Sequence, residues 1–177
     1  MTKFRPSEAI LFIDRTLAVM AGAAVVTATL TIALGTVTRY FLNSPVPGMH
    51  EVIETYGLPM GVMLALGFTF RAGGHVRITL LTRRLSRVWQ RRVGYLSAAI
   101  SLAISIALTY GTATRAIREY SNQSTSSGLM MLPLWVGYLI VFLGLLSLCL
   151  VMVLDTFKIR TMTSEFTSTE EDLDAGI

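Results

Sequence analysis

Four long stretches of the chain carry no charged residue, and short polar segments separate them. They cover residues 17–38, 55–70, 93–114 and 129–154, and are 22, 16, 22 and 26 residues long. About 20 residues of α-helix are needed to cross about 30 Å of hydrocarbon, because each residue adds about 1.5 Å. Only the second stretch is too short, unless Val52 and Ile53 are added to it. The pattern predicts an all-α integral membrane protein with four transmembrane helices, over about 17–38, 52–70, 93–114 and 131–154.

Helix-breaking residues refine these boundaries. Pro6 and Ser7 suit a helix start, so residues 5–15 are expected to form a short interfacial lead-in to the first helix. A turn is expected around Pro45, Pro47 and Gly48. Gly57, Pro59 and Gly61 lie within little more than one turn of the second helix and predict a kink or a close helix crossing there. The fourth helix is expected to begin near Leu132, with Pro133 in its first turn.

The composition leaves no room for a soluble enzyme domain beside the spans. The 177 residues are 53% hydrophobic and 15% charged, and the mean hydropathy is +0.60. We therefore expect a single membrane domain over residues 1–160. Residues 161–177 combine acidic side chains with serines and threonines, which predicts a disordered acidic tail. The lone cysteine, Cys149, lies in the fourth stretch and is expected to be an inert apolar side chain.

The basic residues are distributed unevenly between the two sides of a four-span chain. Twelve of the 15 lysines and arginines lie in the N-terminal segment, the middle connection and the C-terminal segment, which share one side. The other side holds Arg39, Arg115 and Arg118, with the polar loop expected over residues 115–128. The positive-inside rule therefore predicts that both termini are cytoplasmic.

A basic amphipathic helix is predicted between the second and third spans, over about residues 77–90. Apolar residues recur there at helical spacing, and arginines occupy most of the other faces. Such a helix normally lies among anionic lipid headgroups, so we expect a lipid-surface anchor and no nucleic-acid partner. Contact with a larger membrane partner remains the alternative. The expected anchor residues are Arg77, Arg83, Arg84, Arg87, Trp89, Arg91 and Arg92.

Charged residues also gather where the first helix ends and the second begins. Glu51 and Glu54 are three residues apart and share a helix face near Arg39. They could form an ion-paired cluster that fixes the two helix ends or docks a partner. They could equally be a solvated rim, since acids are favoured at helix N-termini.

The chain shows no recognisable catalytic or cofactor-binding pattern. His50 and His75 lie at opposite ends of the second helix, which excludes a shared haem or zinc within one chain. No glycine-rich phosphate-binding loop is present. The middle of each span also lacks ionisable residues, whereas ion-coupled transporters commonly place such groups near the midplane. We therefore expect no enzyme, no cofactor and no metal, and a poor stand-alone ion-coupled transporter.

Three segments resemble a known family in order and spacing. They are Arg39-Tyr40-Phe41-Leu42-Asn43-Ser44 with Pro47-Gly48-Met49-His50-Glu51, then residues 67–78 with His75, and Leu132-Pro133-Leu134-Trp135 with Tyr138 and Gly144. Together they are similar to the small membrane subunit, the DctQ type, of tripartite ATP-independent periplasmic (TRAP) transporters. Thr79 stands where that family usually has an acidic residue.

The resemblance implies a non-catalytic subunit in the bacterial inner membrane. It implies two partners, a large DctM-type subunit that holds the ion and substrate sites and a DctP-type periplasmic binding protein that delivers an organic anion. Two alternatives stay open: a homo-oligomeric small transporter, and a membrane anchor of another complex. The residues expected at a partner or assembly interface are Arg39, Tyr40, Glu51, Glu54, His75, Pro133 and Trp135.

Overall fold

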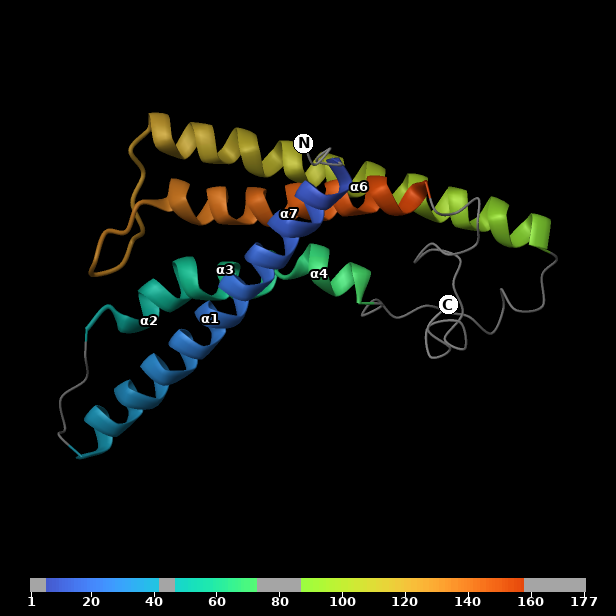
Figure 1. Cartoon of the computed structure of the whole chain (residues 1–177). Coiled ribbons are helices and arrows are strands. Elements are labelled where there is room, and N and C mark those ends of the chain that lie inside the picture. Colours follow the sequence, from blue (N-terminus) through green and yellow to red (C-terminus); the bar gives the residue numbers. More distant parts are fainter. Residues whose placement is uncertain (1–5, 42–46, 73–86, 158–177) are drawn as a thin grey trace, which may run out of the picture.

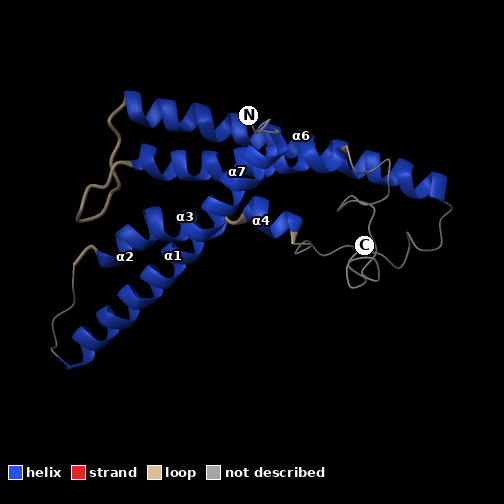
Figure 2. Ribbon diagram, in the orientation of Figure 1, coloured by secondary structure: helices blue, strands red, loops and turns tan. Residues whose placement is uncertain are grey.

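The computed structural model describes residues 6–41, 47–72 and 87–157, which form helices joined by turns (Figure 1). The helices are α1 (Pro6–Phe41), α2 (Met49–Val52), the π-helix η1 (Ile53–Gly57), α3 (Leu58–Met63), α4 (Leu66–Arg71), α6 (Arg87–Ser121) and α7 (Leu134–Thr156). The described residues contain no β-strand, only an isolated bridge between Thr125 and Pro133 (Figure 2). The all-α prediction is confirmed.

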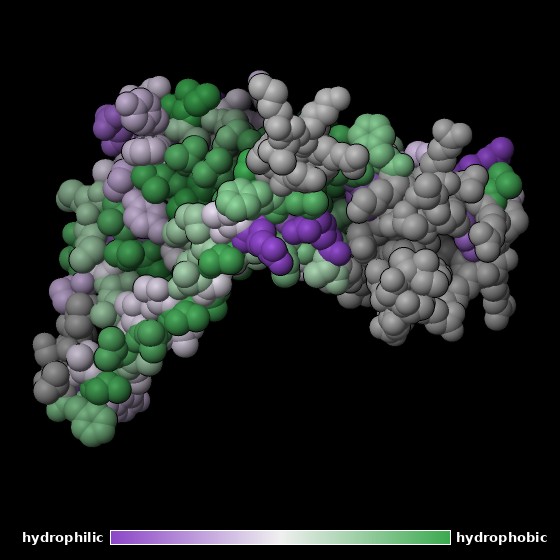
Figure 3. All heavy atoms as spheres, in the orientation of Figure 1, coloured by the Kyte–Doolittle hydropathy of each residue, from purple (hydrophilic) through white to green (hydrophobic). Residues whose placement is uncertain are grey.

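In the part of the chain that the structure describes, four helical segments are long and apolar enough to cross a membrane. They are Ile10–Phe41, Met49–Arg71, Val88–Ser121 and Leu134–Thr156. Each contains one of the four charge-free stretches or most of it, so the predicted number of spans is confirmed. Hydrophobic residues also cover much of the α1 surface that is visible in Figure 3. The chain is a multi-pass membrane protein.

The segment Met49–Arg71, called helix two below, is interrupted twice. Its first interruption is η1, in which the amide of Leu58 donates to the carbonyl of Ile53, five residues back. Pro59 follows at once and has no amide hydrogen, so the carbonyl of Thr55 lacks the donor it would have in an α-helix. A turn at residues 64–65 then separates α3 from α4. Helix two is therefore irregular where a kink or a close crossing was predicted, with one extra residue in the π-helical turn before the proline.

Two glycines of α7 allow it to pack closely against the interrupted part of helix two. A Cβ atom on Gly137 would lie 2.9 Å from the carbonyl oxygen of Thr55. A Cβ atom on Gly144 would collide with the backbone carbonyl of Met63. Small residues permit such backbone contact within a membrane, where helix association depends on close packing.

The most extensive helix contact joins α6 and α7, which lie side by side in Figures 1 and 2. A small core forms where α7 meets the end of α4, from Phe70, Leu148, Val151 and Met152. Helix α1 crosses this group obliquely and extends beyond it (Figure 1). Only 6% of the most apolar part of α1 is buried within the chain, against 44% for α7. Most of α1 is thus left for lipid or another protein to cover.

Helix ends differ from the expected span ends in the second half of the chain. Helix α6 continues to Ser121, so Arg115 and Arg118 lie on a helix and the expected loop over 115–128 was placed too early. Charge marks where a helix leaves hydrocarbon, but no proline or glycine stops this one between 112 and 121. Helix α7 begins at Leu134, and Pro133 precedes it in an extended conformation instead of occupying its first turn.

The other predicted elements can be compared with the structure only in part, because some of them lie outside the described residues. Helix α1 is continuous from Pro6, so the expected lead-in and the first span form one helix. Most of the predicted interfacial helix over 77–90 lies outside the described residues, and its last four residues belong to α6. The acidic tail over 161–177 lies outside them as well.

Candidate functional site at the two ends of helix two

At one end of helix two, a fully buried carboxylate joins three helices. Asp14 of α1 has no exposed surface, and its Oδ2 accepts hydrogen bonds from Arg71 Nε at 2.9 Å and Arg71 Nη2 at 2.5 Å. Its Oδ1 accepts a hydrogen bond from Ser147 Oγ of α7 at 3.1 Å. We call Asp14, Arg71 and Ser147 the Asp14 cluster. It ties α1, the end of α4 and α7 together beside the small apolar core.

Gly67 makes room for this cluster. A Cβ atom at this position would collide with Asp14 Oδ1 and lie 2.8 Å from Ser147 Oγ. A carboxylate in an apolar environment is costly unless it is paired and hydrogen-bonded. Both Asp14 oxygens are satisfied here, so the cluster can fix where α1 crosses helix two and α7.

At the other end of helix two, Glu51 holds the loop between α6 and α7. Its carboxylate accepts a short hydrogen bond from Ser126 Oγ and one from the Met130 amide at 3.0 Å. The Gly128 amide donates to Ser126 Oγ at 3.1 Å, and a Cβ atom on Gly128 would collide with the Glu51 carboxylate. We call Glu51, Ser126 and Met130 the Glu51 cluster.

Backbone bonds complete the order of this loop. The Ser126 amide donates to the Leu132 carbonyl at 2.8 Å, and the Leu134 amide donates to the Ser124 carbonyl at 3.1 Å. Tyr56 Oη of helix two donates to the Pro133 carbonyl at 2.9 Å. The loop is therefore fastened to helix two at two points, and helix two is fixed at both of its ends.

Replacing Glu51 with glutamine is expected to loosen this loop. Ser126 and Met130 donate to different carboxylate oxygens, and glutamine replaces one of these oxygens by an NH₂ group, which cannot accept a hydrogen bond at that position. We expect the Met130 amide to exchange with deuterium several-fold faster than in the wild type. Glu54→Gln is the matched control, because Glu54 is exposed and lies one turn away. Unchanged exchange in Glu51→Gln would show that the carboxylate does not order the loop.

The predicted interface residues do not lie together, and their surroundings differ. Glu51 pairs with the loop, so the interpretation of an ion-paired cluster with Arg39 is not what the structure shows. Arg39, Tyr40 and Glu54 are exposed. Trp135 packs edge-on against Tyr120 of α6, with ring centroids 5.5 Å apart.

Few of the predicted lipid-anchor residues can be placed. Arg77, Arg83 and Arg84, like the interface candidate His75, lie outside the described residues. Arg87 and Arg91 belong to the first turns of α6. Trp89 is exposed on the same helix, and the Arg92 guanidinium lies 5.3 Å from the centre of its ring.

The Asp14 cluster was missed by sequence reasoning. Asp14 was assigned to the lead-in over residues 5–15. Arg71, which lies 57 residues later in the chain, was assigned to the arginine-rich connection between the second and third spans. The available signal was an acidic residue near the start of a long apolar helix, since such residues are usually paired. Among the residues that the structure describes, no group of three or more histidine, cysteine, aspartate or glutamate side chains could hold a metal ion.

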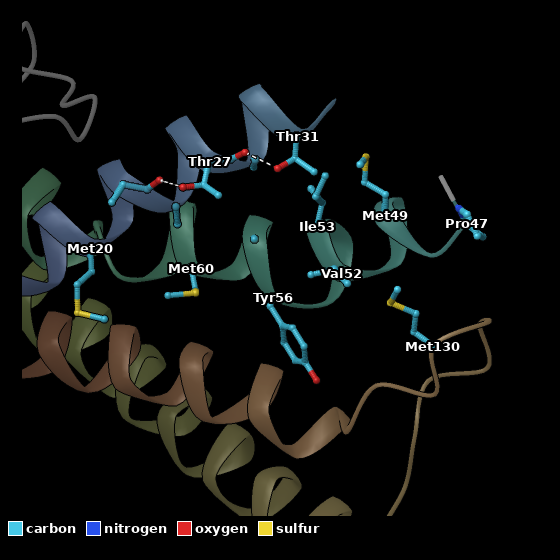
Figure 4. Close-up of a pocket in the computed structure, with 14 residues that line it drawn as sticks. Met20, Thr27, Thr31, Pro47, Met49, Val52, Ile53, Tyr56, Met60 and Met130 are labelled. Atoms are coloured by element: carbon cyan, nitrogen blue, oxygen red, sulfur yellow. Dashed lines mark hydrogen bonds between the residues drawn. The ribbon is translucent and has the colours of Figure 1, made fainter. Parts of the chain in front are cut away.

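An apolar hollow of about 660 Å³ lies between α1 and the first half of helix two (Figure 4). Its walls include Met20, Thr27 and Thr31 of α1, and Ile53, Tyr56 and Met60 of helix two. No titratable carboxylate, histidine or basic side chain lines it. It can accommodate hydrocarbon, but it has no group for acid–base chemistry.

Comparison with known proteins decides the family. The model of the DctQ component of tripartite ATP-independent periplasmic transporters matches residues 28–161. The chain belongs to the DctQ family. It is therefore a small membrane component of a tripartite transporter, a class that also has DctM and DctP components, and the DctQ family is a family of transporter components and not of enzymes. No curated protein and no solved structure matches the chain.

The DctQ match covers both ends of helix two but not all of the Asp14 cluster. Glu51, Arg71 and Ser147 lie within the matched residues, whereas Asp14 precedes them. The first half of α1 is thus joined to the DctQ region by an ion pair whose carboxylate is fully buried.

Proposed function

We propose that this chain is a scaffold for the large, ion-coupled subunit of its transporter. The complex would take up an organic anion, a carboxylate, that a periplasmic binding protein delivers. Family membership supports the subunit role, and one structural observation supports the scaffold role. A long apolar helix, α1, is anchored to the rest of the chain by the Asp14 cluster yet remains largely uncovered.

The uncovered side of α1 carries a continuous apolar ridge. Val26, Leu30, Leu34 and Val37 recur at intervals of three and four residues, and each is at least half exposed. That spacing places them on one helix face. A ridge of this length suits a groove on another membrane helix, and we assign it to the large subunit.

The proposal also includes the orientation of the chain in the membrane. We propose that it lies in the bacterial inner membrane with both termini in the cytoplasm, because twelve of the 15 basic residues then face inward. The basic residues between helix two and α6 would then contact anionic phospholipid headgroups.

Co-purification tests the scaffold role. The full-length tagged chain, expressed with the neighbouring transporter genes and extracted in mild detergent, is expected to bring down the large subunit in equal amounts. Leu30→Gln should reduce that yield several-fold, because a buried amide would face the partner without a hydrogen bond. The matched control is Leu108→Gln, at a similarly exposed leucine of α6. Isolation of the wild-type chain alone, with full transport activity in liposomes, would refute the proposal.

The residues near the Glu51 end are expected to matter for assembly or for docking the binding protein. Arg39→Ala removes an exposed cation, and Glu51→Gln weakens the loop that presents Leu129 and Met131 at the surface. We expect each to lower complex yield or uptake by at least severalfold. Wild-type yield and uptake in both variants would show that this end of the chain has neither role.

A further inference from the structure

The loop between α6 and α7 holds a carboxylate group that comes from another part of the chain. Ser126 Oγ donates to Oε1 of Glu51, and the Met130 amide donates to Oε2. Gly128 lies so close that a Cβ atom at this position would collide with the same carboxylate. Residues 126–132 thus bend around the end of the Glu51 side chain. We call these residues the carboxylate loop.

The negative charge of Glu51 is met by neutral donors. No lysine or arginine among the described residues forms an ion pair with it. The Gly128 amide donates to Ser126 Oγ at 3.1 Å, which leaves the Ser126 hydroxyl hydrogen free to point at Glu51. Backbone amides and hydroxyls gathered in a turn form anion-binding concavities. The carboxylate loop therefore has the donor set of an anion site without a basic side chain.

The positions of these donors suit a carboxylate better than other small groups. Ser126 and Met130 donate to different oxygens of one planar group. A halide has a single centre and cannot take both positions. A primary amide places an NH₂ group where the second acceptor is needed. The loop is thus matched to a planar group with two acceptor oxygens.

The base of the loop is closed by bonds that do not involve Glu51. The Ser126 amide donates to the Leu132 carbonyl at 2.8 Å, and the Leu134 amide donates to the Ser124 carbonyl at 3.1 Å. The residues between 127 and 131 are exposed, so solutes can reach the site. Shortening the Glu51 side chain would therefore leave an open site with its donors still close together.

We propose that the carboxylate loop is a binding site for a carboxylate group, which Glu51 fills as a built-in ligand and which a carboxylate from outside the chain fills when Glu51 is absent. Glu51 belongs to the first turn of helix two. An external carboxylate would therefore order the loop without this tie to helix two. The inference does not depend on the scaffold role, since it concerns only residues of this chain.

Chemical rescue by acetate tests the site. Glu51→Ala removes the atoms that acetate can restore, and the full-length variant is purified in mild detergent. We expect its Met130 amide to exchange with deuterium several-fold faster than in the wild type. Two hydrogen bonds to a charged group in an open site give weak binding, so sodium acetate at about 100 mM should restore at least half of the lost protection. Sodium chloride and acetamide at the same concentration should restore none of it.

Matched variants show whether acetate acts at the loop. Glu54→Ala, at an exposed carboxylate one turn away, should neither speed the exchange nor respond to acetate. Adding Ser126→Ala to Glu51→Ala removes one donor and should raise the acetate concentration for half-maximal rescue at least fivefold. Ser127→Ala, at the exposed neighbouring serine, should leave that concentration unchanged.

The test holds even if Glu51→Ala does not fold by itself. In that case, recovery of folded chain in acetate and not in acetamide supports the site. The proposal is overturned if acetate restores neither folding nor protection of the Met130 amide. Equal rescue by acetate, chloride and acetamide would overturn it as well, because the loop would then not recognise a carboxylate.

Discussion

Replacing Arg71 with alanine is expected to destabilise the chain by somewhat less than the about 3–5 kcal/mol that removing one partner of a fully buried ion pair costs, because the Arg71 side chain is 31% exposed. The cost falls on Asp14, which is fully buried and would keep only its hydrogen bond from Ser147. With the Asp14 cluster weakened, α1 loses its anchor to helix two and α7. Reversible unfolding in mixed micelles measures the loss.

Two further variants distinguish the loss of the ion pair from a general destabilisation of the fold. Arg15→Ala removes an exposed arginine of the same helix end and should change the unfolding free energy by no more than about 0.5 kcal/mol. The double variant Asp14→Leu with Arg71→Met should recover most of the loss, because apolar residues of similar volume often replace a buried ion pair without cost. Equal stability of Arg71→Ala and Arg15→Ala would show that the cluster does not hold α1.

Gly144→Ala is expected to push α7 away from helix two. The added Cβ would collide with the Met63 carbonyl, which is backbone and cannot rotate away. Overpacking of this kind costs about 1–3 kcal/mol. Gly137→Ala should have a smaller effect, since its Cβ would meet the Thr55 carbonyl at 2.9 Å. Unfolding in mixed micelles ranks the two variants.

The matched control for both is Gly111→Ala on α6, where an added Cβ meets nothing within 4 Å. Alanine is favoured over glycine inside a helix by about 0.5–1 kcal/mol, so this variant should be neutral or slightly stabilising. If Gly144→Ala were as stable as Gly111→Ala, the close approach of α7 to helix two would not contribute to the fold.

The sequence predicted the four spans because their apolar runs match the thickness of hydrocarbon, a constraint that acts on each helix separately. It also predicted irregularity in helix two, since Pro59 removes an amide hydrogen wherever it stands. The extra residue of η1 and the approach of Gly137 could not be foreseen. They depend on how α7 lies against Thr55, which is a tertiary contact.

The partners of the charged residues were harder to predict from the sequence, because they too depend on tertiary contacts. The sequence left two surroundings open for Glu51, an ion pair near Arg39 or a solvated helix N-terminus. The structure instead supplies the hydroxyl of Ser126 and the amide of Met130, because a folded loop can present backbone donors to a carboxylate. Asp14 and Arg71 are far apart in the chain, and only the antiparallel arrangement of α1 and helix two brings them together.

The Asp14 cluster and the Glu51 cluster support the proposal that this chain braces the complex while the large subunit carries out transport. Helix two is held at its Arg71 end by Asp14 and at its Glu51 end by the loop before α7. A chain fixed in this way is suited to bracing a partner. The middle of each span carries no charged side chain, whereas ion-coupled transporters commonly place such groups within the bilayer.

Transport by vesicles that contain this polypeptide alone tests that division most directly. An inward sodium or proton gradient is imposed, and solute uptake is followed together with decay of the gradient. We expect neither uptake nor accelerated decay from the chain alone, and uptake once the large subunit and the binding protein are added. Gradient-driven uptake by the chain without any other protein would contradict the proposed scaffold role.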